Sequence, residues 1–504
     1  MYIVTAEEMY EIDRYAIEKG GIAGKLLMEN AGSQVAHQIK KAYDINQRIA
    51  IVVGSGNNGG DGFVIGRYLA EYGFDVTLFQ LVADQKIKGD AAYHKQLFLN
   101  HSDKLEHVTE SNQLKDRLIA YRLVVDAILG IGVSGEVREP IRSMIEVINQ
   151  SDLTRISVDI PSGLPANDGE DVDIAVKADQ TYIIEAPKVS TFCEPTSNYY
   201  GNWDIVKIGI PTSAYLEVAS KRWRTTSEVQ ASFPNKGIYA HKGSNGRGVI
   251  IGAQPTMPGS VLLSARAALR SGAGLITVAT LKENIPIIAN GCVEATYHVL
   301  PNLMDRLSEK DLKAFEQFDA IAVGMGMGRA RSELLSSIIE NLDKPVLIDA
   351  DGLYHLKTFL DKKAEKRATI IITPHYGEMA MLSNLSVSDI KKAPFEVSKQ
   401  FAIKHKLYIV LKGKNTIITT PNGTQIVSNQ GNPGLAKGGT GDVLSGILLT
   451  MIMQHPTILD GLANGAYVHG MAADLLIDQK QHTEIDLLAT DVIEGLSQVF
   501  RTFS

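Results

Sequence analysis

Cysteine is almost absent from this sequence, and its scarcity excludes a disulfide framework. Only Cys193 and Cys292 occur in 504 residues, and we expect them to fall in different domains. Two isolated thiols fit a reducing compartment, so we predict a cytoplasmic protein. Long apolar runs are also missing. The sequence contains no stretch of about 20 apolar residues, which is the length needed to cross a membrane. The first residues lack a basic segment followed by an apolar one, which disfavours secretion.

Concentrated positive charge is missing as well. The formal net charge is -7, and no run of Lys and Arg offers a surface to nucleic acid or to an anionic membrane. Hydrophobic residues at 44% and charged residues at 21% are ordinary for a globular enzyme. We therefore expect small-molecule substrates and no nucleic acid or membrane partner. We also expect a homo-oligomer.

The length of the chain predicts more than one domain. At 504 residues it exceeds a single hydrophobic core, because a domain usually has about 150 residues. We predict two α/β domains, residues 1–222 and 223–504. Residues 213–237 carry mixed charge without a clear period, so we place the linker within them and expect regular structure to resume near Glu228.

The segment 432–451, NPGLAKGGTGDVLSGILLTM, predicts a glycine-rich loop that leads into a helix. Apolar residues recur at helical spacing after Asp442, so one face of that helix is buried. Glycines before the helix leave backbone N–H groups uncovered where the helix dipole attracts an anion such as phosphate. These glycines are Gly438, Gly439 and Gly441.

Asp442 places a carboxylate beside this predicted anion site, and two interpretations are open. Asp is a favoured N-cap residue, so the side chain could simply cap the helix. Alternatively, it could accept a proton from a hydroxyl group that attacks phosphorus. The GGTGD motif favours the second interpretation, because it resembles the anion-hole and base motif of ribokinase-like small-molecule kinases and of the related NAD(P)H-hydrate dehydratases.

A second glycine-rich segment follows an apolar strand in the first half of the chain. Ile49–Val53 is apolar, GSGNNGGDG occupies 54–62, and a helical pattern covers 63–72. This order presents backbone N–H groups to a phosphate, although it can also be a tight strand-to-helix turn. Asn57, Asn58 and Asp61 supply side-chain oxygens that a purely structural turn does not need.

Polar residues follow several predicted strands of the first half. Further strands are expected at 75–81, 123–129, 156–160, 181–184 and 205–210, mostly separated by helices, which predicts a doubly wound parallel sheet. Ligands bind at the carboxyl ends of such strands. Asn58, Asp126, Asp159 and Ser162 should converge there, and their hard oxygen ligands suit an s-block cation.

The first half resembles the YjeF N-terminal family, the NAD(P)H-hydrate epimerases. The matching segments are MYIVTAEEMYEIDRYAI, LLMENAG, GSGNNGGDGF, DAILGIGVSGE and VDIPSGL, in that order, over 1–212. The resemblance implies a Rossmann-like domain with K⁺ held by Asn58, Asp126 and Ser162, and with Asp159 as the candidate proton-transfer group. It implies hydrate binding at Asn57, Asn58, Gly59, Gly60, Asp61, Gly130, Ile131, Gly132, Val133, Ser134, Gly135, Glu136 and Asp159.

The second half predicts another open α/β sheet. A glycine-flanked strand lies within 241–253, a helix covers 258–274, and strands follow at 276–279, Ala320–Val323, Pro345–Ile348, 370–373 and Tyr408–Leu411. Four clusters follow strands: GMGMG at 324–328, DADGL at 349–353, TPHYGE at 373–378 and KGKNT at 412–416. His375 alone could be a surface residue, and Lys412 alone could face solvent.

Together with GGTGD, these clusters resemble the YjeF C-terminal family, the ribokinase-like NAD(P)H-hydrate dehydratases, over 228–500. The resemblance implies that Ser260, Gly326, His375 and Asp442 face the hydrate. It implies ADP or ATP binding with Mg²⁺ by Lys412, Gly413, Lys414, Asn415, Thr416, Gly438, Gly439 and Gly441. Three residues depart from the family pattern, which usually has alanine, proline and a small residue there: Ser260, Met325 and Lys437.

The two resemblances imply one repair pathway for hydrated NADH and NADPH, which are named NADHX and NADPHX. Phosphorylation by ADP or ATP converts the hydroxyl group on carbon 6 into a leaving group, with Asp442 as the base and Gly438 to Gly441 stabilising phosphoryl charge. The other domain interconverts the R and S epimers, because the dehydratase accepts the S form alone.

Two other functions remain open from the residues. The second domain could be a kinase for a small vitamin-precursor alcohol, since GGTGD occurs in such enzymes, although GSNGRG and TPHYGE favour the dehydratase. The first domain could be a binding module in which Asp159 and the cation site are purely structural. Interconversion of the hydrate epimers by residues 1–222 would distinguish an epimerase from a binding module.

Overall fold

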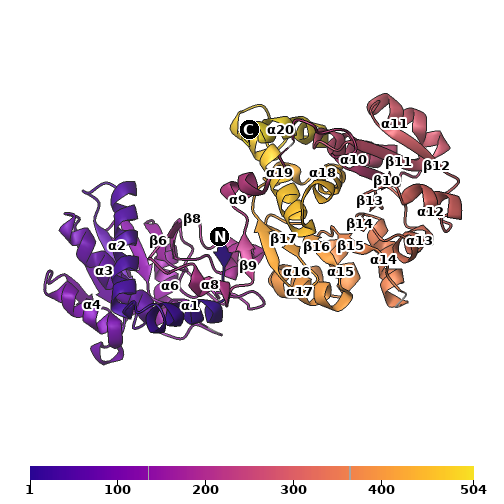
Figure 1. Cartoon of the computed structure of the whole chain (residues 1–504). Coiled ribbons are helices and arrows are strands. Elements are labelled where there is room, and N and C mark those ends of the chain that lie inside the picture. Colours follow the sequence, from indigo (N-terminus) through magenta and orange to yellow (C-terminus); the bar gives the residue numbers. More distant parts are fainter. Residues whose placement is uncertain (134, 236, 363–364, 504) are drawn as a thin grey trace. The chain divides into compact units, whose positions relative to one another are not determined.

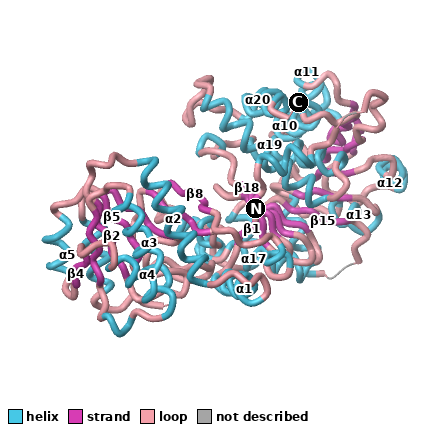
Figure 2. The backbone as a smooth tube through the Cα atoms, turned by 60° about the vertical axis from the view of Figure 1, so that its left-hand side comes forward, coloured by secondary structure: helices cyan, strands magenta, loops and turns pink. Residues whose placement is uncertain are grey.

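The computed structural model describes residues 1–133, 135–235, 237–362 and 365–503. The chain divides into two compact units, one made of Met1–Ser220 with Lys391–Ala393, the other of Lys221–Ile390 with Pro394–Ser504. In each unit, the strands lie side by side as a sheet, and helices pack around it (Figures 1 and 2). Among the described residues, no helix is both long enough and apolar enough to span a bilayer.

The first unit is built on a fully parallel sheet with the strand order β4-β3-β2-β5-β6-β7-β8. The strands of this sheet are β2 (Ile49–Val53), β3 (Val76–Gln80), β4 (Leu105–His107), β5 (Leu123–Ala127), β6 (Thr154–Val158), β7 (Gln180–Ile184) and β8 (Asn202–Val206). The unit also contains the short strand β1 (Tyr2–Ile3), which is not part of this sheet. Its helices are α1 (Ala6–Glu18), α2 (Gly24–Ala42), α3 (Asn57–Glu71), α4 (Gly89–Leu99), α5 (Ser111–Leu118), α6 (Ile141–Gln150), α7 (Glu194–Ser197) and α8 (Ser213–Leu216).

Alternating side chains of β2 feed two hydrophobic cores, one on each face of the sheet. Ile49, Ile51 and Val53 pack with residues of α2 and α3. Ala50 and Val52 pack with residues of α5 and α6 on the other face. Burial on both faces explains why β2 is an uninterrupted apolar run. The predicted doubly wound α/β fold is confirmed.

The second unit has a mostly parallel sheet with the order β9-β18-β17-β16-β15-β14-β13-β10-β11-β12, in which β16, β17 and β18 pair antiparallel. Its strands are β9 (Lys221–Trp223), β10 (Arg247–Ile251), β11 (Leu275–Leu281), β12 (Thr296–Leu300), β13 (Ala320–Val323), β14 (Pro345–Ile348), β15 (Thr369–Ile372), β16 (Tyr408–Leu411), β17 (Thr416–Thr419) and β18 (Gln425–Ser428).

The helices of the second unit include a pair, α18 and α19, that packs with α10 over the sheet (Figure 1). They are α9 (Thr226–Ser232), α10 (Pro258–Arg270), α11 (Ile285–Gly291), α12 (Glu309–Phe315), α13 (Leu334–Asn341), α14 (Gly352–Asp361), α15 (Tyr376–Ser383), α16 (Val387–Lys392), α17 (Pro394–His405), α18 (Thr440–Gln454), α19 (Ile458–Asp478) and α20 (Ala489–Arg501). Short 3₁₀ helices cover Asp84–Lys86, Val189–Phe192, Lys282–Asn284 and Pro433–Leu435.

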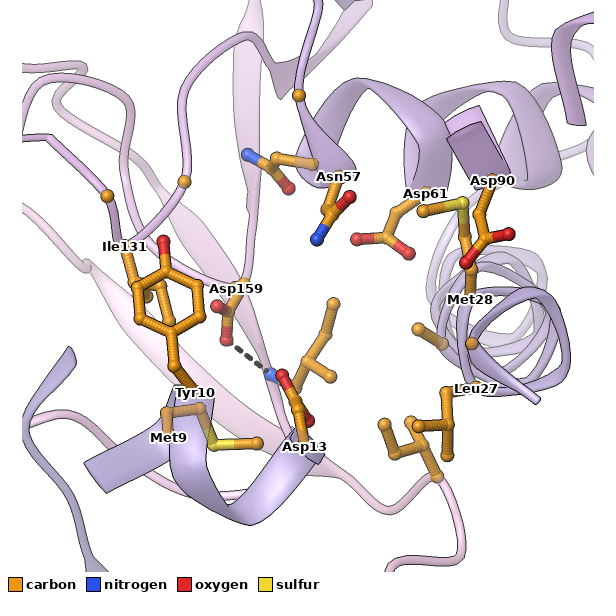
Figure 3. A pocket seen from close by; sticks show the side chains of 18 of the residues that line it. Met9, Tyr10, Asp13, Leu27, Met28, Asn57, Asp61, Asp90, Ile131 and Asp159 are labelled. Atoms are coloured by element: carbon orange, nitrogen blue, oxygen red, sulfur yellow. Dashed lines mark hydrogen bonds between the residues drawn. The ribbon is translucent and has the colours of Figure 1, made fainter. Parts of the chain in front are cut away.

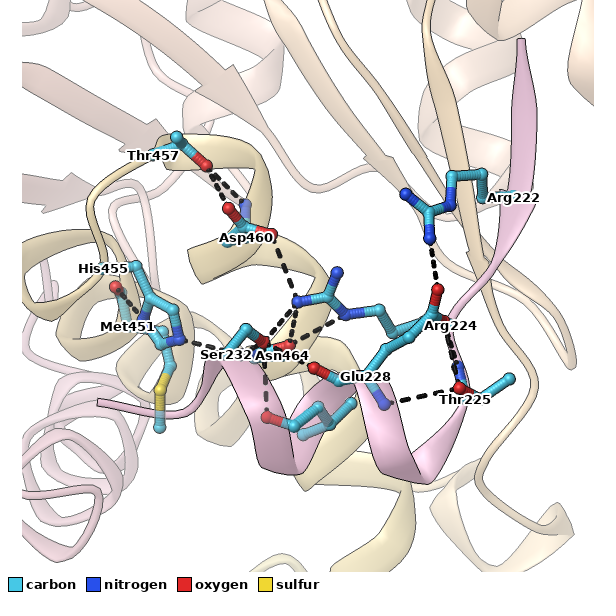
Figure 4. A network of polar contacts seen from close by, with 11 residues as sticks. Arg222, Arg224, Thr225, Glu228, Ser232, Met451, His455, Thr457, Asp460 and Asn464 are labelled. Carbon is cyan, nitrogen blue, oxygen red and sulfur yellow. Dashed lines mark hydrogen bonds and ion pairs between the residues drawn. The ribbon is translucent and has the colours of Figure 1, made fainter. Parts of the chain in front are cut away.

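The segment 213–237, within which we placed the linker, contains the division between the two units, after Ser220, together with regular structure. It holds α8, β9 and α9, which are too short to show a period in the sequence. A buried polar network fixes β9 and α9 (Figure 4). Arg224, which is 7% exposed, donates to Asn464 Oδ1 at 3.0 Å and 2.8 Å, to Ser232 Oγ at 2.6 Å and to Asp460 Oδ1 at 3.2 Å.

Strand β8 differs from its predicted position. The apolar residues at 205–210 favoured a strand there, but the strand spans Asn202–Val206. Its side chains alternate between exposed and buried at one edge of the sheet, which hides the strand in the sequence. Gly209 then has a φ of +94°, which ends the extended chain.

Candidate active sites

The first unit contains a cavity of about 590 Å³ at the carboxyl ends of its strands (Figure 3). The chain leaves β2 toward β3 and β4 on one side, whereas β5 and β6 lie on the other side. The cavity therefore opens at the switch point of a doubly wound sheet, where ligands usually bind. Its lining comes from α1, α2, α3 and α4 and from the segments around the ends of β5, β6, β7 and β8.

Helix α3 begins at Asn57, so most of the glycine-rich segment is helix rather than the predicted loop. Gly56 is the N-cap residue, and Asn57 and Asn58 line the cavity from the first turn. The glycines permit close packing, since a Cβ at Gly59 would lie 2.3 Å from Gly54 O and one at Gly60 would lie 2.5 Å from Met28 Sδ. The free N–H groups of this first turn suit an anion.

Asn58, Asp126 and Ser162, predicted as cation ligands, come together around the carbonyl oxygen of Leu129. Asn58 Nδ2 donates to that oxygen at 2.7 Å, and Ser162 Oγ lies 3.2 Å from it. Ser162 Oγ also lies 2.5 Å from Asp126 Oδ1. Asn58 Oδ1 is buried and has no hydrogen-bond partner among the described residues. This unsatisfied oxygen, among other oxygen ligands, fits a cation such as K⁺.

Asp126 is deeply buried and accepts several hydrogen bonds. Its carboxylate accepts from Ser157 Oγ and from Ser162 N, both at 2.9 Å, and from Ile128 N at 3.3 Å. Burial raises the pKa of Asp126, although these hydrogen bonds oppose the shift. The carboxylate thus also fixes the turns after β5 and β6.

Asp159 forms an ion pair with Lys188, a residue that the sequence did not identify. Lys188 is 1% exposed, and its ammonium also donates to the carbonyl oxygens of Ile184 and Ala186 at 3.2 Å and 3.1 Å. Asp159 has a φ of +64°, a strained value for a residue with a Cβ. The ion pair and the hydrogen bond from Ile184 N at 2.9 Å hold this conformation.

Asp13 is a further cavity residue that the sequence did not identify. It lies on α1 one turn after the buried Met9 and one turn before the buried Ala16, so it lies on the buried side of that helix. Burial raises the pKa of Asp13 to about 6, against the effect of Lys188. The sequence feature that could have identified Asp13 is a carboxylate on an otherwise apolar helix face.

The predicted hydrate-binding segment 130–136 lies only partly at the cavity. Gly130, Ile131, Gly132 and Val133 line it, and Ser134 lies outside the described residues. Gly135 and Glu136 are exposed and do not belong to the lining, and neither do Gly59 and Gly60.

In the second unit, helix α18 begins at Thr440, and its N-cap is Gly439 with a φ of +91°. Asp442 therefore lies in the first turn, and no side chain caps this helix. The capping interpretation of Asp442 is wrong. The backbone oxygen of Asp442 accepts from Ser264 Oγ at 2.9 Å, which connects α18 to α10.

The Asp442 carboxyl group belongs to a charged cluster at the carboxyl ends of β14 and β16. Asp349 is 2% exposed, and its Oδ1 lies 2.9 Å from Lys412 Nζ. Ser445 Oγ donates to the other Asp349 oxygen at 2.7 Å. Glu378 Oε2 lies 3.9 Å from Lys412 Nζ. Asp349, Glu378 and Ser445 had no predicted role.

Mutual charge and burial set the protonation of this cluster. Burial, and next the Asp349 carboxylate, raise the pKa of Asp442 to about 7, while Lys412 and a hydrogen bond from Ser260 oppose the rise. Burial disfavours ionised Asp349, but Lys412 and the hydrogen bonds from Ser445 and Thr373 together outweigh burial and lower the pKa of Asp349. Asp442 can therefore gain or lose a proton near neutral pH while Asp349 stays ionised.

Lys412 belongs to this cluster, whereas Lys414 contacts a nearby loop. A Cβ on Gly441 would lie 3.6 Å from Lys412 Nζ, so the ammonium adjoins the first turn of α18. Lys414 Nζ donates to Gly431 O at 2.7 Å, and Thr416 begins β17. Gly413 packs against Tyr376, since a Cβ there would lie 2.6 Å from the phenol oxygen.

His375 is the N-cap of α15. Its Nδ1 accepts from Gly377 N at 3.0 Å and from Glu378 N at 3.2 Å. An accepting Nδ1 carries no proton, so the neutral ring holds its proton on Nε2, and 59% of the side chain is exposed. Ser260 and Gly326 are neighbours, because a Cβ on Gly326 would lie 3.2 Å from Ser260 Oγ.

His469 on α19 lies next to Thr440, the first residue of α18. The sequence analysis did not identify this histidine. Burial lowers its pKa to about 4, although a hydrogen bond to the Thr440 backbone opposes the shift. Its Nε2 is buried without a hydrogen-bond partner among the described residues. Within the described part of the chain, no three His, Cys, Asp or Glu side chains are arranged to hold a metal ion.

Comparisons with known proteins match both units. A family model described as NAD(P)H-hydrate dehydratase matches residues 248–497, and one described as YjeF-related protein N-terminus matches 24–190. An ADP/ATP-dependent NAD(P)H-hydrate dehydratase from Bacillus subtilis, co-crystallised with ATP and Mg²⁺, is 30% identical with a TM-score of 0.49, over 56% of this chain and 99% of its own.

Full-length relatives contain both parts in one chain. The bifunctional NAD(P)H-hydrate repair enzyme of Moorella thermoacetica is 32% identical over 515 residues, which cover 99% of this chain and 97% of the relative. The enzyme of the same name from Escherichia coli is 31% identical over 497 residues, with 98% and 93% covered. The chain therefore belongs to the family of bifunctional NAD(P)H-hydrate repair enzymes.

Proposed function

We propose that this protein repairs hydrated NADH and NADPH with two active sites on one chain. The first unit interconverts the R and S hydrate epimers, and the second dehydrates the S form with ADP or ATP. The observation that carries this proposal is the presence of two separate sites, the cavity beside Asp159 and the cluster around Asp442. Family membership over both halves agrees with it.

In the dehydratase reaction, the hydroxyl group on carbon 6 must become a better leaving group. Asp442 takes the hydroxyl proton as the oxygen attacks the terminal phosphorus, and a pKa near 7 suits that task. The first-turn amides of α18 and the Lys412 ammonium stabilise charge on the transferred phosphoryl group. The lone pair of the ring nitrogen then expels phosphate, and loss of a proton from carbon 5 restores the double bond.

We assign the remaining dehydratase contacts to residues around this cluster. Ser260 hydrogen-bonds to Asp442, and Gly326 adjoins Ser260. The exposed His375 side chain, whose Nε2 lies 3.5 Å from Glu378 Oε1, can donate to the hydrate. The segment Lys412, Gly413, Lys414, Asn415 and Thr416 binds the nucleotide with Gly438, Gly439 and Gly441. Mg²⁺ enters with the nucleotide, because it prefers phosphate oxygens and a few carboxylates over a cage made of protein.

In the epimerase site, the first turn of α3 and the loop after β5 bind the hydrate. Asn57, Asn58 and Asp61 from that turn and Gly130, Ile131, Gly132 and Val133 from that loop all line the cavity. Gly59, Gly60 and the end of the loop, Ser134 to Glu136, belong to the same proposed segments. The carboxylate of Asp159, held by Lys188, orients the hydrate in the cavity.

We propose that K⁺ binds at Asn58, Asp126 and Ser162 and fixes the loop after β5. The unsatisfied Asn58 Oδ1 supports this site. Changing Asn58 to Ala should abolish the K⁺ dependence of epimerisation and lower K⁺ binding measured by the thermal shift that K⁺ produces. Dehydration on the same chain serves as the control. An unchanged K⁺ response in the variant would contradict the assignment.

Two further properties belong to this proposal. We infer a cytoplasmic protein, because Cys193 and Cys292 are both free and buried thiols. We also infer a homo-oligomer, which sedimentation of the purified protein would test directly.

The test of the function uses a mixture of NADHX epimers with ADP or ATP. We expect consumption of both epimers and recovery of NADH absorbance with release of inorganic phosphate. Omitting the nucleotide should stop dehydration and leave epimerisation active. Accumulation of a stable phosphorylated alcohol would instead indicate a small-alcohol kinase in the second unit.

A further inference from the structure

Two carboxyl groups face the epimerase cavity and make no polar contact with a side chain among the described residues. Asp13 on α1 and Asp61 on α3 both line the cavity, and Figure 3 shows them across the open space from each other. Neither carboxyl group makes a hydrogen bond or an ion pair with a side chain in the described part of the chain. Asp159 differs from both, because Lys188 and Ile184 N already hold its carboxylate.

The surroundings of these groups disfavour two negative charges. Burial raises the pKa of Asp61 well above its usual value, and Asp159 and Asp13 add to the effect. Burial also raises the pKa of Asp13 to about 6. The other charged and titratable groups near Asp13 are Tyr10 and Arg14 from α1, Tyr215 from α8, and Asp159, Glu185 and Lys188 from the segments after β6 and β7.

Epimerisation at carbon 6 has a geometric requirement. If the hydroxyl group leaves as water from one face of the ring, a new water molecule must add to the other face. The departing oxygen needs a proton donor, and the incoming water needs a proton acceptor on the opposite side. An enzyme that acts on both epimers needs each group to play both roles, according to which epimer is bound.

We propose that Asp13 and Asp61 form the acid–base pair of the epimerase, one on each face of the bound nicotinamide ring. This assignment rests on the proposed function of the first unit. It leaves Asp159 and Lys188 to orient the ring. Both proposed groups touch the reacting oxygens directly, so both are catalytic residues.

The proposed step balances in protons and electrons. The protonated carboxyl group of Asp61 gives its proton to the hydroxyl oxygen, the bond between carbon 6 and oxygen breaks with its electron pair on oxygen, and water leaves. The lone pair of the ring nitrogen forms a double bond to carbon 6. A water molecule on the other face attacks carbon 6 and gives a proton to the Asp13 carboxylate, and the electron pair returns to nitrogen.

The reverse reaction starts from the product state, with the proton on Asp13 and the charge on Asp61. The pair therefore works when it holds a single proton, which mutual repulsion of the two carboxylates favours. The epimerase rate should fall below about pH 6, where Asp13 also becomes protonated. A second fall should occur at higher pH, where Asp61 loses its proton.

The decisive measurement uses the unaltered full-length protein in water enriched in oxygen-18. Each epimerisation should place an oxygen from solvent on carbon 6, measured by mass spectrometry and corrected for the reaction without protein. Epimerisation that retains the original oxygen would overturn the proposal, because it indicates ring opening instead. A protein that does not accelerate epimerisation at all would disprove the epimerase function itself and this assignment with it.

Substitution of Asp13 gives the second test. Asp13→Asn should lower the epimerase rate by roughly 10²- to 10⁴-fold and remove the fall below about pH 6. Glu11→Gln is the matched control, since Glu11 lies on the same helix with an exposed side chain. Circular dichroism verifies folding. A folded Asp13→Asn variant with the wild-type rate, or with the wild-type acid limb, would exclude Asp13.

Discussion

At the scale of single residues, Asp442 carries the clearest prediction. Asp442→Asn keeps the side-chain shape but cannot accept a proton near neutral pH. Because Gly439 is the N-cap of α18, stability should change little. Dehydration should fall by roughly 10²- to 10⁴-fold, the usual contribution of a positioned base.

The same protein sample contains the control for this variant. Epimerisation takes place in the other unit and should keep its rate, and ADP or ATP binding measured by calorimetry should persist. Near-normal dehydration by a folded Asp442→Asn variant would show that the carboxylate is not the base.

Ser260 should tune the pH dependence of that base. The rate of dehydration, as kcat/KM, should rise with pH through about 7, because Asp442 must be ionised to accept a proton. The Ser260 hydrogen bond favours the ionised form, so Ser260→Ala should raise the pKa of Asp442 and move the rise to higher pH. A pH profile of kcat/KM measures the shift, and an unchanged midpoint would show that the hydrogen bond has no such effect.

Sequence analysis proposed site residues where a short motif contains them. Asp442, Asp159 and His375 each lie in such a motif. The ion pair of Asp349 with Lys412 joins residues 63 positions apart, and Asp13 meets the cavity only because α1 folds across it. Partners of this kind depend on the packing of distant elements, which a single sequence does not specify.

At the scale of elements, α19 should make the second unit sensitive to acid. His469 has a folded pKa of about 4, below the usual 6.5, so its contribution to stability is present above pH 6.5 and is lost as pH falls toward 4. The loss is on the order of 3 kcal/mol. Lys412 also disfavours the charged form of His469.

Thermal unfolding of the full chain between pH 4 and 7 measures this effect. His469→Gln should flatten the pH dependence of the transition that belongs to the second unit. A wild-type slope in the variant would assign the acid sensitivity to other groups, such as His455, whose pKa burial also lowers.

The types of most elements were predictable, whereas several boundaries were not. Strands β2, β13, β14 and β16 match their predicted ranges because buried parallel strands are continuous apolar runs. Helices α3 and α18 begin earlier than predicted, at Asn57 and Thr440. Glycine usually indicates a turn, but in α3 it permits close contacts such as that of Gly59 with Gly54 O.

At the scale of the whole molecule, the two units should function separately. Each has its own sheet, cores and candidate site, so cleavage after Ser220 should give two folded fragments. We expect epimerisation from residues 1–220 and dehydration from 221–504, measured on the purified fragments. Loss of both activities in soluble fragments would show that each unit requires the other.

The Arg224 network sets where a gene for the dehydratase alone could begin. Asn464 is fully buried, and Arg224 is a donor to it and to Asp460. A chain that began at Thr226 would keep α9 but would leave the buried Asn464 Oδ1 without this donor, at a cost of about 1–3 kcal/mol. A separate dehydratase chain should therefore begin before Arg224, so that the donor to Asn464 is kept.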